Sequence, residues 1–468
     1  MSTARKVVVI GAGPAGYVCA IRLAQLGQDV TCVEKDELGG TCLNVGCIPS
    51  KALIAAGALM DKVRNASAMG ITAKGVELDL PKLVEWKDGI VKRLTGGVGG
   101  LFKNHKVKHV VGAARITGKN SVEVKTTKGT ETLTCDDIVI ATGSVPSSIP
   151  GFDFDGKHVW SSTEALAPDR IPDHLLVIGG GYIGLELGIL YHKLGSKVTV
   201  VEFTDGALPG QDRDCVKIIE RGLKKAKVKL VTKTAAKRYE VKGDELVVHV
   251  ESRDGKADTI KCDQVLCTVG RRPYSEGLGL ESVGLQVDKA GFLATDKQMR
   301  TQVPNVYAIG DIAGQPMLAH KGSKEGLVAA AVIAGQPEEY DARCVPAVIF
   351  THPEMASVGL LEEQAKEAGH EVVTGQFPFA ASGRAMSLME TDGFVKIVAD
   401  KQTDEVLGVH MVGPEVTELI AEAALAIEMG ATTEDIARTI HAHPTLPEAM
   451  MEAAEAVHKM AVHIYQKR

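Results

Sequence analysis

The sequence predicts an α/β fold with two Rossmann-like dinucleotide-binding domains, followed by a C-terminal α+β domain. Three observations lead to this prediction. A unit of strand, glycine loop, helix and strand begins near the N-terminus and returns 168 residues later, with Gly179 in the place of Gly11. Each copy ends its second strand on an acid, Glu34 or Glu202. Near the C-terminus, alternating strands are followed by apolar helices without such a loop.

The expected elements follow from the periodicity of apolar residues and from the glycines that end each helix. In the first copy they are strand Lys6–Ile10, loop 11–16, helix Tyr17–Leu26 and strand Asp29–Glu34; in the second, strand Leu175–Ile178, loop 179–184, a helix to about Leu194 and strand Lys197–Glu202. In the C-terminal part they are strands Phe394–Ala399 and Val406–Val412 and helices Val416–Met429 and Leu446–Ile464.

The glycines and the acid of each copy have distinct physical roles. The first glycine makes a tight turn, the second lets the backbone approach a pyrophosphate, and the third lets helix and strand pack closely. The acid hydrogen-bonds a ribose hydroxyl. A single loop of this kind is weak evidence, but two copies in the same order are strong. The residues are Gly11, Gly13, Gly16 and Glu34 in the first copy and Gly179, Gly181, Gly184 and Glu202 in the second.

Two dinucleotide sites in one chain indicate two cofactors, one of which passes electrons to the other. Glu202 favours NAD over NADP at the second site, because its carboxylate would repel a 2′-phosphate. The residues that follow it, Phe203, Thr204 and Asp205, include no arginine that would bind such a phosphate.

Composition excludes several classes of protein. The chain has 468 residues, 45% hydrophobic and 24% charged, with a net charge of -6, which argues against general nucleic-acid binding. The most apolar stretch, Leu327–Ala334, is shorter than the roughly 20 residues of a membrane span. Only Met1–Arg5 precede the first strand, too few for a targeting peptide. We therefore expect a cytoplasmic protein that binds neither nucleic acid nor membrane; a processed organellar protein fits equally.

Two of the nine cysteines, Cys42 and Cys47, are expected to lie in a glycine-rich turn that leads into a helix. A disulfide requires Cα atoms about 4.4–6.8 Å apart, so the turn must be distorted, and Gly46 permits this. A helix N-terminus stabilises a thiolate, which predicts a reactive sulfur at Cys47.

Two other kinds of cysteine chemistry are less consistent with the sequence. Cys262 and Cys267 have the same spacing but adjoin the apolar run Val265–Val269, where a strand would hold the thiols about 16 Å apart, so they are expected to be inert. A zinc site at Cys42 and Cys47 is disfavoured, since structural zinc takes four ligands and no second pair stands nearby.

A candidate acid–base pair lies near the C-terminus. His443 precedes a proline, and Glu448 follows five residues later. Histidine titrates near neutral pH and suits proton transfer with a thiol, and a hydrogen-bonded carboxylate would orient it. His441 has no assignable chemistry and is expected to be structural.

Residues 40–51, Gly-Thr-Cys-Leu-Asn-Val-Gly-Cys-Ile-Pro-Ser-Lys, resemble the redox-disulfide signature of the flavin-dependent pyridine nucleotide–disulfide oxidoreductases. Leu43, Ile48 and Ser50 are similar to the members of that family that oxidise dihydrolipoamide. The resemblance covers essentially the whole chain, including Thr301–Asp311, which resembles the second FAD motif. Tyr274 departs from an expected asparagine, outside the reacting centre.

The resemblance implies FAD at the first site, NAD at the second, and a set of further cofactor residues. On the flavin side these are Thr41, Lys51, Gly112, Thr142, Gly143, Asp311 and Ala319; on the other side they are Glu186, as the partner of Lys51, and Gly270. It also implies that substrate thiolate attacks Cys42, that Cys47 leaves and contacts the flavin, and that His443 with Glu448 is the base.

The resemblance further implies four segments: an FAD domain (1–145), an NAD domain (146–270), a central part that completes the FAD domain (271–345) and an interface domain (346–468). The interface domain would form a homodimer in which the histidine reaches the disulfide of the other subunit. Expected partners are lipoyl domains and the acyltransferase core of 2-oxoacid dehydrogenase complexes, or the lipoylated glycine cleavage protein.

Other members of the fold are less consistent with the sequence. A glutathione reductase would carry arginines for NADP, and a mercuric ion reductase would carry cysteines after Cys344. A non-catalytic flavoprotein scaffold would have lost Cys42, Cys47 or His443, and all three are present.

Overall fold

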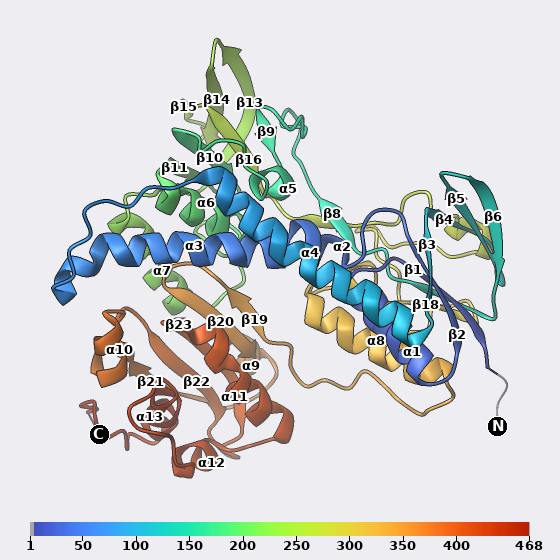
Figure 1. Ribbon diagram of the computed structural model, residues 1–468. Helices are drawn as coiled ribbons and strands as arrows, with labels where there is room; N and C mark the ends of the chain where they lie inside the picture. Colours follow the sequence, from blue (N-terminus) through green and yellow to red (C-terminus); the bar gives the residue numbers. More distant parts are fainter. Residues whose placement is uncertain (1–3, 468) are drawn as a thin grey trace. The chain divides into compact units, whose positions relative to one another are not determined.

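The computed structural model describes residues 4–467, which form two compact units (Figure 1). Unit 1 contains residues 4–149, 160–170 and 269–341, and unit 2 contains residues 150–159, 171–268 and 342–467. Each unit holds one parallel sheet built from one copy of the repeat, which confirms the predicted fold class. The division into four domains stays a prediction.

Unit 1 is built on a parallel sheet in the order β18-β7-β1-β2-β3. The strands are β1 (Lys6–Ile10), β2 (Asp29–Glu34), β3 (Lys108–Val111), β7 (Asp137–Ile140) and β18 (Val306–Ala308). Smaller sheets are formed by β4 (Ala113–Gly118), β5 (Ser121–Thr126) and β6 (Gly129–Thr134), and by β8 (Ser144–Pro146) and β17 (Arg271–Pro273). The helices are α1 (Pro14–Gln25), α2 (Gly40–Val45), α3 (Cys47–Asn65), α4 (Leu80–His105), α5 (Ser162–Ala165) and α8 (Ala319–Ile333).

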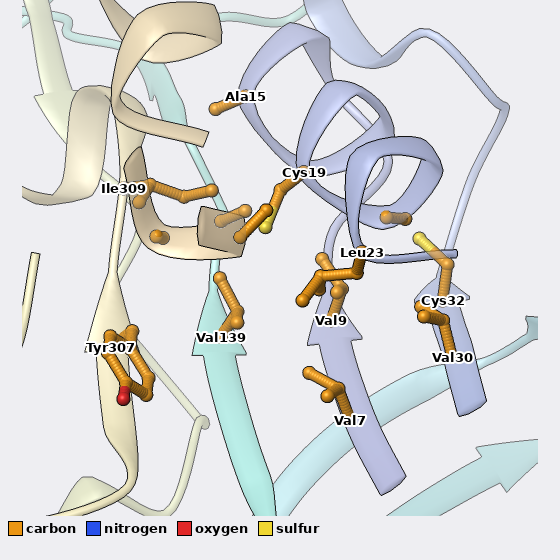
Figure 2. Close-up of a cluster of buried hydrophobic side chains, with 14 of the residues drawn as sticks. Val7, Val9, Ala15, Cys19, Leu23, Val30, Cys32, Val139, Tyr307 and Ile309 are labelled. Atoms are coloured by element: carbon orange, nitrogen blue, oxygen red, sulfur yellow. The ribbon is translucent and has the colours of Figure 1, made fainter. Parts of the chain in front are cut away.

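The core of unit 1 lies between this sheet and helix α1. Ala15, Cys19 and Leu23 recur at four-residue intervals on one helical face. Cys19 and Leu23 point towards side chains of the sheet (Figure 2), whereas Ala15 faces Gly310 and Gly322. Helix α8 packs closely on α1, because Gly326 brings the two backbones together: a Cβ there would lie 2.6 Å from the Ala15 carbonyl oxygen. The packing fixes the N-terminus of α1, where the first glycine loop stands.

One helical run differs from the expectation for membrane segments. Gly40–Met69 is long enough to span a membrane and contains an 18-residue window with a mean hydropathy of 1.5, so the expectation that no such segment exists is wrong on these two criteria. A third of its most apolar window, 33%, is buried, and α3 packs against α4. Core helices of globular proteins meet the same criteria.

The nucleotide-binding half of unit 2 repeats the order of unit 1. Its sheet runs β12-β11-β10-β16-β9, and β10 and α6 each begin 168 residues after β1 and α1. The elements are β9 (Val159–Trp160), β10 (His174–Ile178), α6 (Tyr182–Leu194), β11 (Lys197–Val201), α7 (Arg213–Lys225), β12 (Lys229–Val231) and β16 (Gln264–Cys267), with an antiparallel sheet of β13 (Thr234–Lys242), β14 (Glu245–Ser252) and β15 (Ala257–Cys262).

The C-terminal half of unit 2 is an antiparallel sheet, β19-β20-β23-β22-β21, with helices beside it. Its elements are β19 (Ala347–Ile349), β20 (Glu354–Gly359), α9 (Glu362–Glu367), β21 (Val372–Pro378), α10 (Gly383–Leu388), β22 (Phe394–Asp400), β23 (Val406–Gly413), α11 (Val416–Met429), α12 (Thr433–Arg438) and α13 (Glu448–Val457).

Two local expectations are wrong. The final helix ends at Val457 rather than Ile464, because Lys459 has a left-handed φ of 58° and the Glu452 carboxylate accepts the Val462 backbone N–H instead. Cys262 and Cys267 do not share a strand: Cys262 ends β15 and Cys267 ends β16. Both are buried, and burial raises the pKa of Cys262 to about 12, so an unreactive thiol is expected there.

Candidate active site

The two glycine loops have the same geometry. Gly11 and Gly179 have φ of 104° and 103°, a left-handed conformation that favours glycine. A Cβ on Gly16 would lie 1.9 Å from the Gly11 oxygen, and one on Gly184 would lie 2.1 Å from the Gly179 oxygen, so neither site admits a side chain. The second glycine of each loop, Gly13 or Gly181, instead faces open space, with no atom within 4 Å of a Cβ placed there.

That combination fits a dinucleotide in both units. The first glycine is required by its backbone conformation and the third by its close contact with the first, so neither requirement involves a ligand. The open second position leaves room for a pyrophosphate at the N-terminus of the following helix. Helix α1 follows the first loop and α6 follows the second.

The two acids are also held alike. Glu34 is buried and accepts the backbone N–H groups of Ala12, at 2.7 Å, and Asp36, at 3.0 Å. Glu202 is buried and accepts those of Gly180, at 2.6 Å, and Thr204, at 2.7 Å. An ionised carboxylate has about four acceptor positions, so each keeps capacity for a ribose hydroxyl. Each acid therefore also positions its own glycine loop, a role that sequence reasoning missed.

Asp311 lies in a polar chain that the sequence did not reveal. Its carboxylate accepts the Ser144 hydroxyl at 2.5 Å, and that hydroxyl accepts Nε of Arg271 at 2.8 Å. Ser144 and Arg271 are distant in sequence and meet because β8 pairs with β17. This chain fixes the rotamer of Asp311, which a ligand-binding carboxylate needs.

A second unpredicted pair holds the loop that contains Asp311. Lys321 and Glu325 are buried on α8 and lie 2.7 Å apart. Glu325 accepts the Gly310 backbone N–H at 2.6 Å, and Lys321 donates to the Gly314 carbonyl at 3.1 Å. Their i,i+4 spacing on α8, the helix that follows the motif, was the available sequence signal.

The other predicted flavin-side residues also lie in unit 1. Thr142 donates to the Tyr274 carbonyl at 2.7 Å, and Gly143 accepts the Tyr274 N–H at 2.9 Å, so the departure at residue 274 leaves both backbone contacts in place. Gly112 has no room for a side chain, because a Cβ would lie 2.7 Å from the Lys125 oxygen. The remaining flavin-side residues are Thr41 on α2, Lys51 on α3 and Ala319, the first residue of α8. Gly270, which was predicted for the NAD side, has a φ of 128°.

The cysteine pair lies at a break between two helices. Cys42 is in α2 and Cys47 begins α3, so the predicted glycine-rich turn is wrong for Cys42: the segment is already helical. The Asn44 side chain stabilises α2 by donating to the carbonyls of Gly40, at 2.9 Å, and Leu38, at 3.0 Å. The predicted distortion falls at Gly46, where a Cβ would lie 2.8 Å from the Thr41 oxygen.

A hydrogen bond joins the two thiols. The hydrogen bond with Cys47 and partial burial raise the pKa of Cys42 well above its usual range, while the charge of Lys51 opposes the rise. Asp311 also raises it, which places that carboxylate near the pair. Cys47 is the more exposed of the two sulfurs and begins α3, and a helix N-terminus favours a thiolate.

His443 and Glu448 are brought together in unit 2. Nδ1 of His443 lies 2.8 Å from Oε1 of Glu448, and the other Glu448 oxygen accepts the Thr445 N–H at 2.7 Å. Partial burial raises the pKa of Glu448, but these two hydrogen bonds lower it more, so the pKa lies below its ordinary value. The His443 side chain is 81% exposed, so Nε2 faces outward, where it can accept a proton.

The side chain of His441, unlike that of His443, is buried and has both ring nitrogens engaged. Its side chain is 6% exposed, Nε2 lies 2.8 Å from the Glu422 carboxylate, and Nδ1 lies 2.8 Å from the Thr439 carbonyl oxygen. Both ring nitrogens are occupied within the fold, which supports a structural role.

Glu186 is also buried in unit 2, where its carboxylate accepts the Phe350 N–H at 2.8 Å.

Comparisons with known proteins agree with this geometry. Residues 5–326 match the family model described as pyridine nucleotide-disulphide oxidoreductase, and residues 345–454 match its dimerisation domain. The chain is 51% identical to the dihydrolipoyl dehydrogenase of Thermus scotoductus, covering 98% of this chain and 99% of that protein. It is 51% identical to that of Bacillus subtilis, covering 98% and 97%. The crystal structure of LpdA from Mycobacterium tuberculosis aligns with a TM-score of 0.90 at 29% identity, covering 97% and 99%.

Proposed function

This chain belongs to the pyridine nucleotide–disulphide oxidoreductase family, and we propose that it oxidises dihydrolipoamide to lipoamide through Cys42 and Cys47 while NAD+ is reduced to NADH. It is an NAD-dependent flavoprotein enzyme. The observation that carries the assignment of residues is the interacting thiol pair at the break between α2 and α3.

The proposed thiol chemistry assigns one role to each of these side chains. The oxidised pair receives a substrate thiolate at the Cys42 sulfur; the Cys42–Cys47 bond breaks, and Cys47 leaves as a thiolate. The second substrate sulfur then attacks the mixed disulfide, which releases lipoamide and Cys42. His443 accepts the substrate proton at Nε2, because Nδ1 is engaged by Glu448.

The cofactors are held by the two loops. Bound FAD supplies a two-electron carrier between the dithiol and NAD+. The first loop, Glu34 and Asp311 would hold the flavin dinucleotide, and the second loop with Glu202 would hold NAD+. Lys51 and Glu186 are proposed as a pair beside the flavin.

The dimerisation-domain match of residues 345–454 supports a homodimer. We propose that His443 of one subunit serves the cysteine pair of the other. The proposed partners are lipoyl domains and the acyltransferase core of 2-oxoacid dehydrogenase complexes, or the lipoylated glycine cleavage protein; the cytoplasm is the proposed compartment.

An anaerobic absorption spectrum tests the function. Dihydrolipoamide added to the purified holoenzyme should reduce it within the dead time of manual mixing, and NAD+ should then reoxidise it with formation of NADH. NADP+ is the control acceptor. A flavin spectrum unchanged by dihydrolipoamide, but bleached by NADH, would contradict the substrate and leave the nucleotide site in place.

A further inference from the structure

The loop after β11 has a cationic neighbour that its own sequence does not show. Arg253 follows β14, in the turn before β15. Its Nη1 lies 2.7 Å from Oδ1 of Asp205, and its guanidinium carbon lies 5.1 Å from the centre of the Phe203 ring. An arginine therefore stands over the residue adjacent to Glu202, although none occurs in residues 203–205.

Backbone hydrogen bonds fix the position of Arg253. Its N–H donates to the Lys233 carbonyl at 2.8 Å, and the Lys233 N–H donates to the Thr204 carbonyl at 2.9 Å. The Thr204 N–H in turn donates to the Glu202 carboxylate at 2.7 Å. A continuous chain of contacts thus links the turn to the proposed ribose acid, so the proximity of Arg253 does not depend on its side-chain conformation.

The side chains themselves can rearrange. Arg253 is 46% exposed and Asp205 is 73% exposed, and an ion pair this open to solvent is weakly held. Arg213 also lies near this loop, but it donates to the Ala207 carbonyl at 3.0 Å and faces Glu220 at 3.6 Å, so its side chain is held further along the chain.

An arginine near the ribose acid is the group that accommodates the 2′-phosphate in NADP-binding Rossmann domains. We infer that Asp205 is a specificity-determining positioning residue, which engages Arg253 and so withholds it from a 2′-phosphate. Selection against NADP+ is then achieved twice, by the Glu202 carboxylate and by the occupied arginine. This inference rests on the proposed function, since it takes the Glu202 site as the NAD+ site.

The test is a direct binding measurement on the holoenzyme, independent of turnover. Isothermal titration with adenosine 2′,5′-bisphosphate, with 5′-AMP as the reference ligand, is made for the unchanged protein, Asp205→Ala, Arg253→Ala and the double variant. Asp205→Ala leaves the guanidinium without its ion-pair partner and removes a charge that repels the 2′-phosphate, so affinity for the bisphosphate should rise about three- to fivefold. The double variant should lose most of that gain, and affinity for 5′-AMP should stay within about twofold.

Glu245→Ala is the matched control, because it removes a carboxylate from an exposed ion pair, with Lys261 at 2.9 Å, at the opposite end of β14. It should leave both affinities unchanged. No gain in Asp205→Ala, an equal gain in the double variant, or an equal gain in Glu245→Ala would each overturn the inference while NAD+ still binds. If the unchanged protein binds neither NAD+ nor 5′-AMP, the nucleotide site itself is wrong, and both proposals are overturned.

Discussion

Replacing His443 by glutamine should separate catalysis from folding, and His441→Gln provides the matched comparison. Nδ1 of His443 is engaged by Glu448 at 2.8 Å and the ring is 81% exposed, so the variant loses the proton acceptor and little packing. Removal of a general base costs about 10²–10⁴-fold in rate, or about 2.7–5.5 kcal/mol of barrier. The free energy of unfolding should change by less than about 0.5 kcal/mol.

His441→Gln should show the reverse. Its ring is 6% exposed and bonds to Glu422 and to the Thr439 carbonyl oxygen, and glutamine can replace only part of this. We expect a loss of about 1–3 kcal/mol in stability with near-normal turnover. The assays are dihydrolipoamide-dependent NAD+ reduction, NADH oxidation by an artificial acceptor, and thermal unfolding. If His443→Gln slowed both redox assays equally, or if His441→Gln were the variant that lost turnover, the assignment of the base would be refuted.

Three further predictions follow from single contacts. Glu448→Gln should slow thiol oxidation less than His443→Gln does, because it only weakens the orientation of the His443 ring. The pKa of Glu448 is lowered in the fold, so this carboxylate stabilises the fold above its ordinary pKa of 4.5, and the stabilisation is lost as pH falls through the folded pKa. An acid titration followed by circular dichroism should show that loss in the unchanged protein and not in the variant. Lys396→Met should cost about 3–5 kcal/mol in chemical denaturation, because the buried Asp212 carboxylate, 3.0 Å from the ammonium, loses its cationic partner and keeps only its backbone hydrogen bonds to α7. An unchanged midpoint would contradict this. Gly181→Ala should fold normally and weaken NAD+ binding, whereas Gly184→Ala should be destabilised by about 1–3 kcal/mol, because only a Cβ on Gly184 meets a backbone oxygen. Equal stabilities of the two variants would contradict the proposed roles of these glycines.

Sequence predicted best where local pattern and tertiary contact agree. Strand β1 and helix α11 have the predicted bounds, because a buried parallel strand and an amphipathic helix each show in their own periodicity. The α2 helix was missed, since Gly39 and Gly40 indicate a turn while the Asn44 side chain holds the next residues helical.

Contacts between distant segments had no local signal. Ser144 meets Arg271 only when β8 pairs with β17, and Arg253 reaches Asp205 only when the β14–β15 turn lies against the loop after β11. The sequence thus predicts the glycines, acids and cysteines of the sites, because these residue types in these motifs indicate their chemistry. It does not predict the distant side chains that orient them.

Steady-state oxidation of dihydrolipoamide by purified Cys42→Ser and Cys47→Ser proteins tests the central claim most directly. The account predicts that each variant binds FAD normally, measured by absorbance after gel filtration, and forms no NADH from dihydrolipoamide and NAD+, whereas the unchanged protein forms one NADH for each lipoamide. Near-normal turnover by either flavin-loaded variant would contradict the role of the pair, because a single sulfur at the break between α2 and α3 cannot form the disulfide that accepts the electrons.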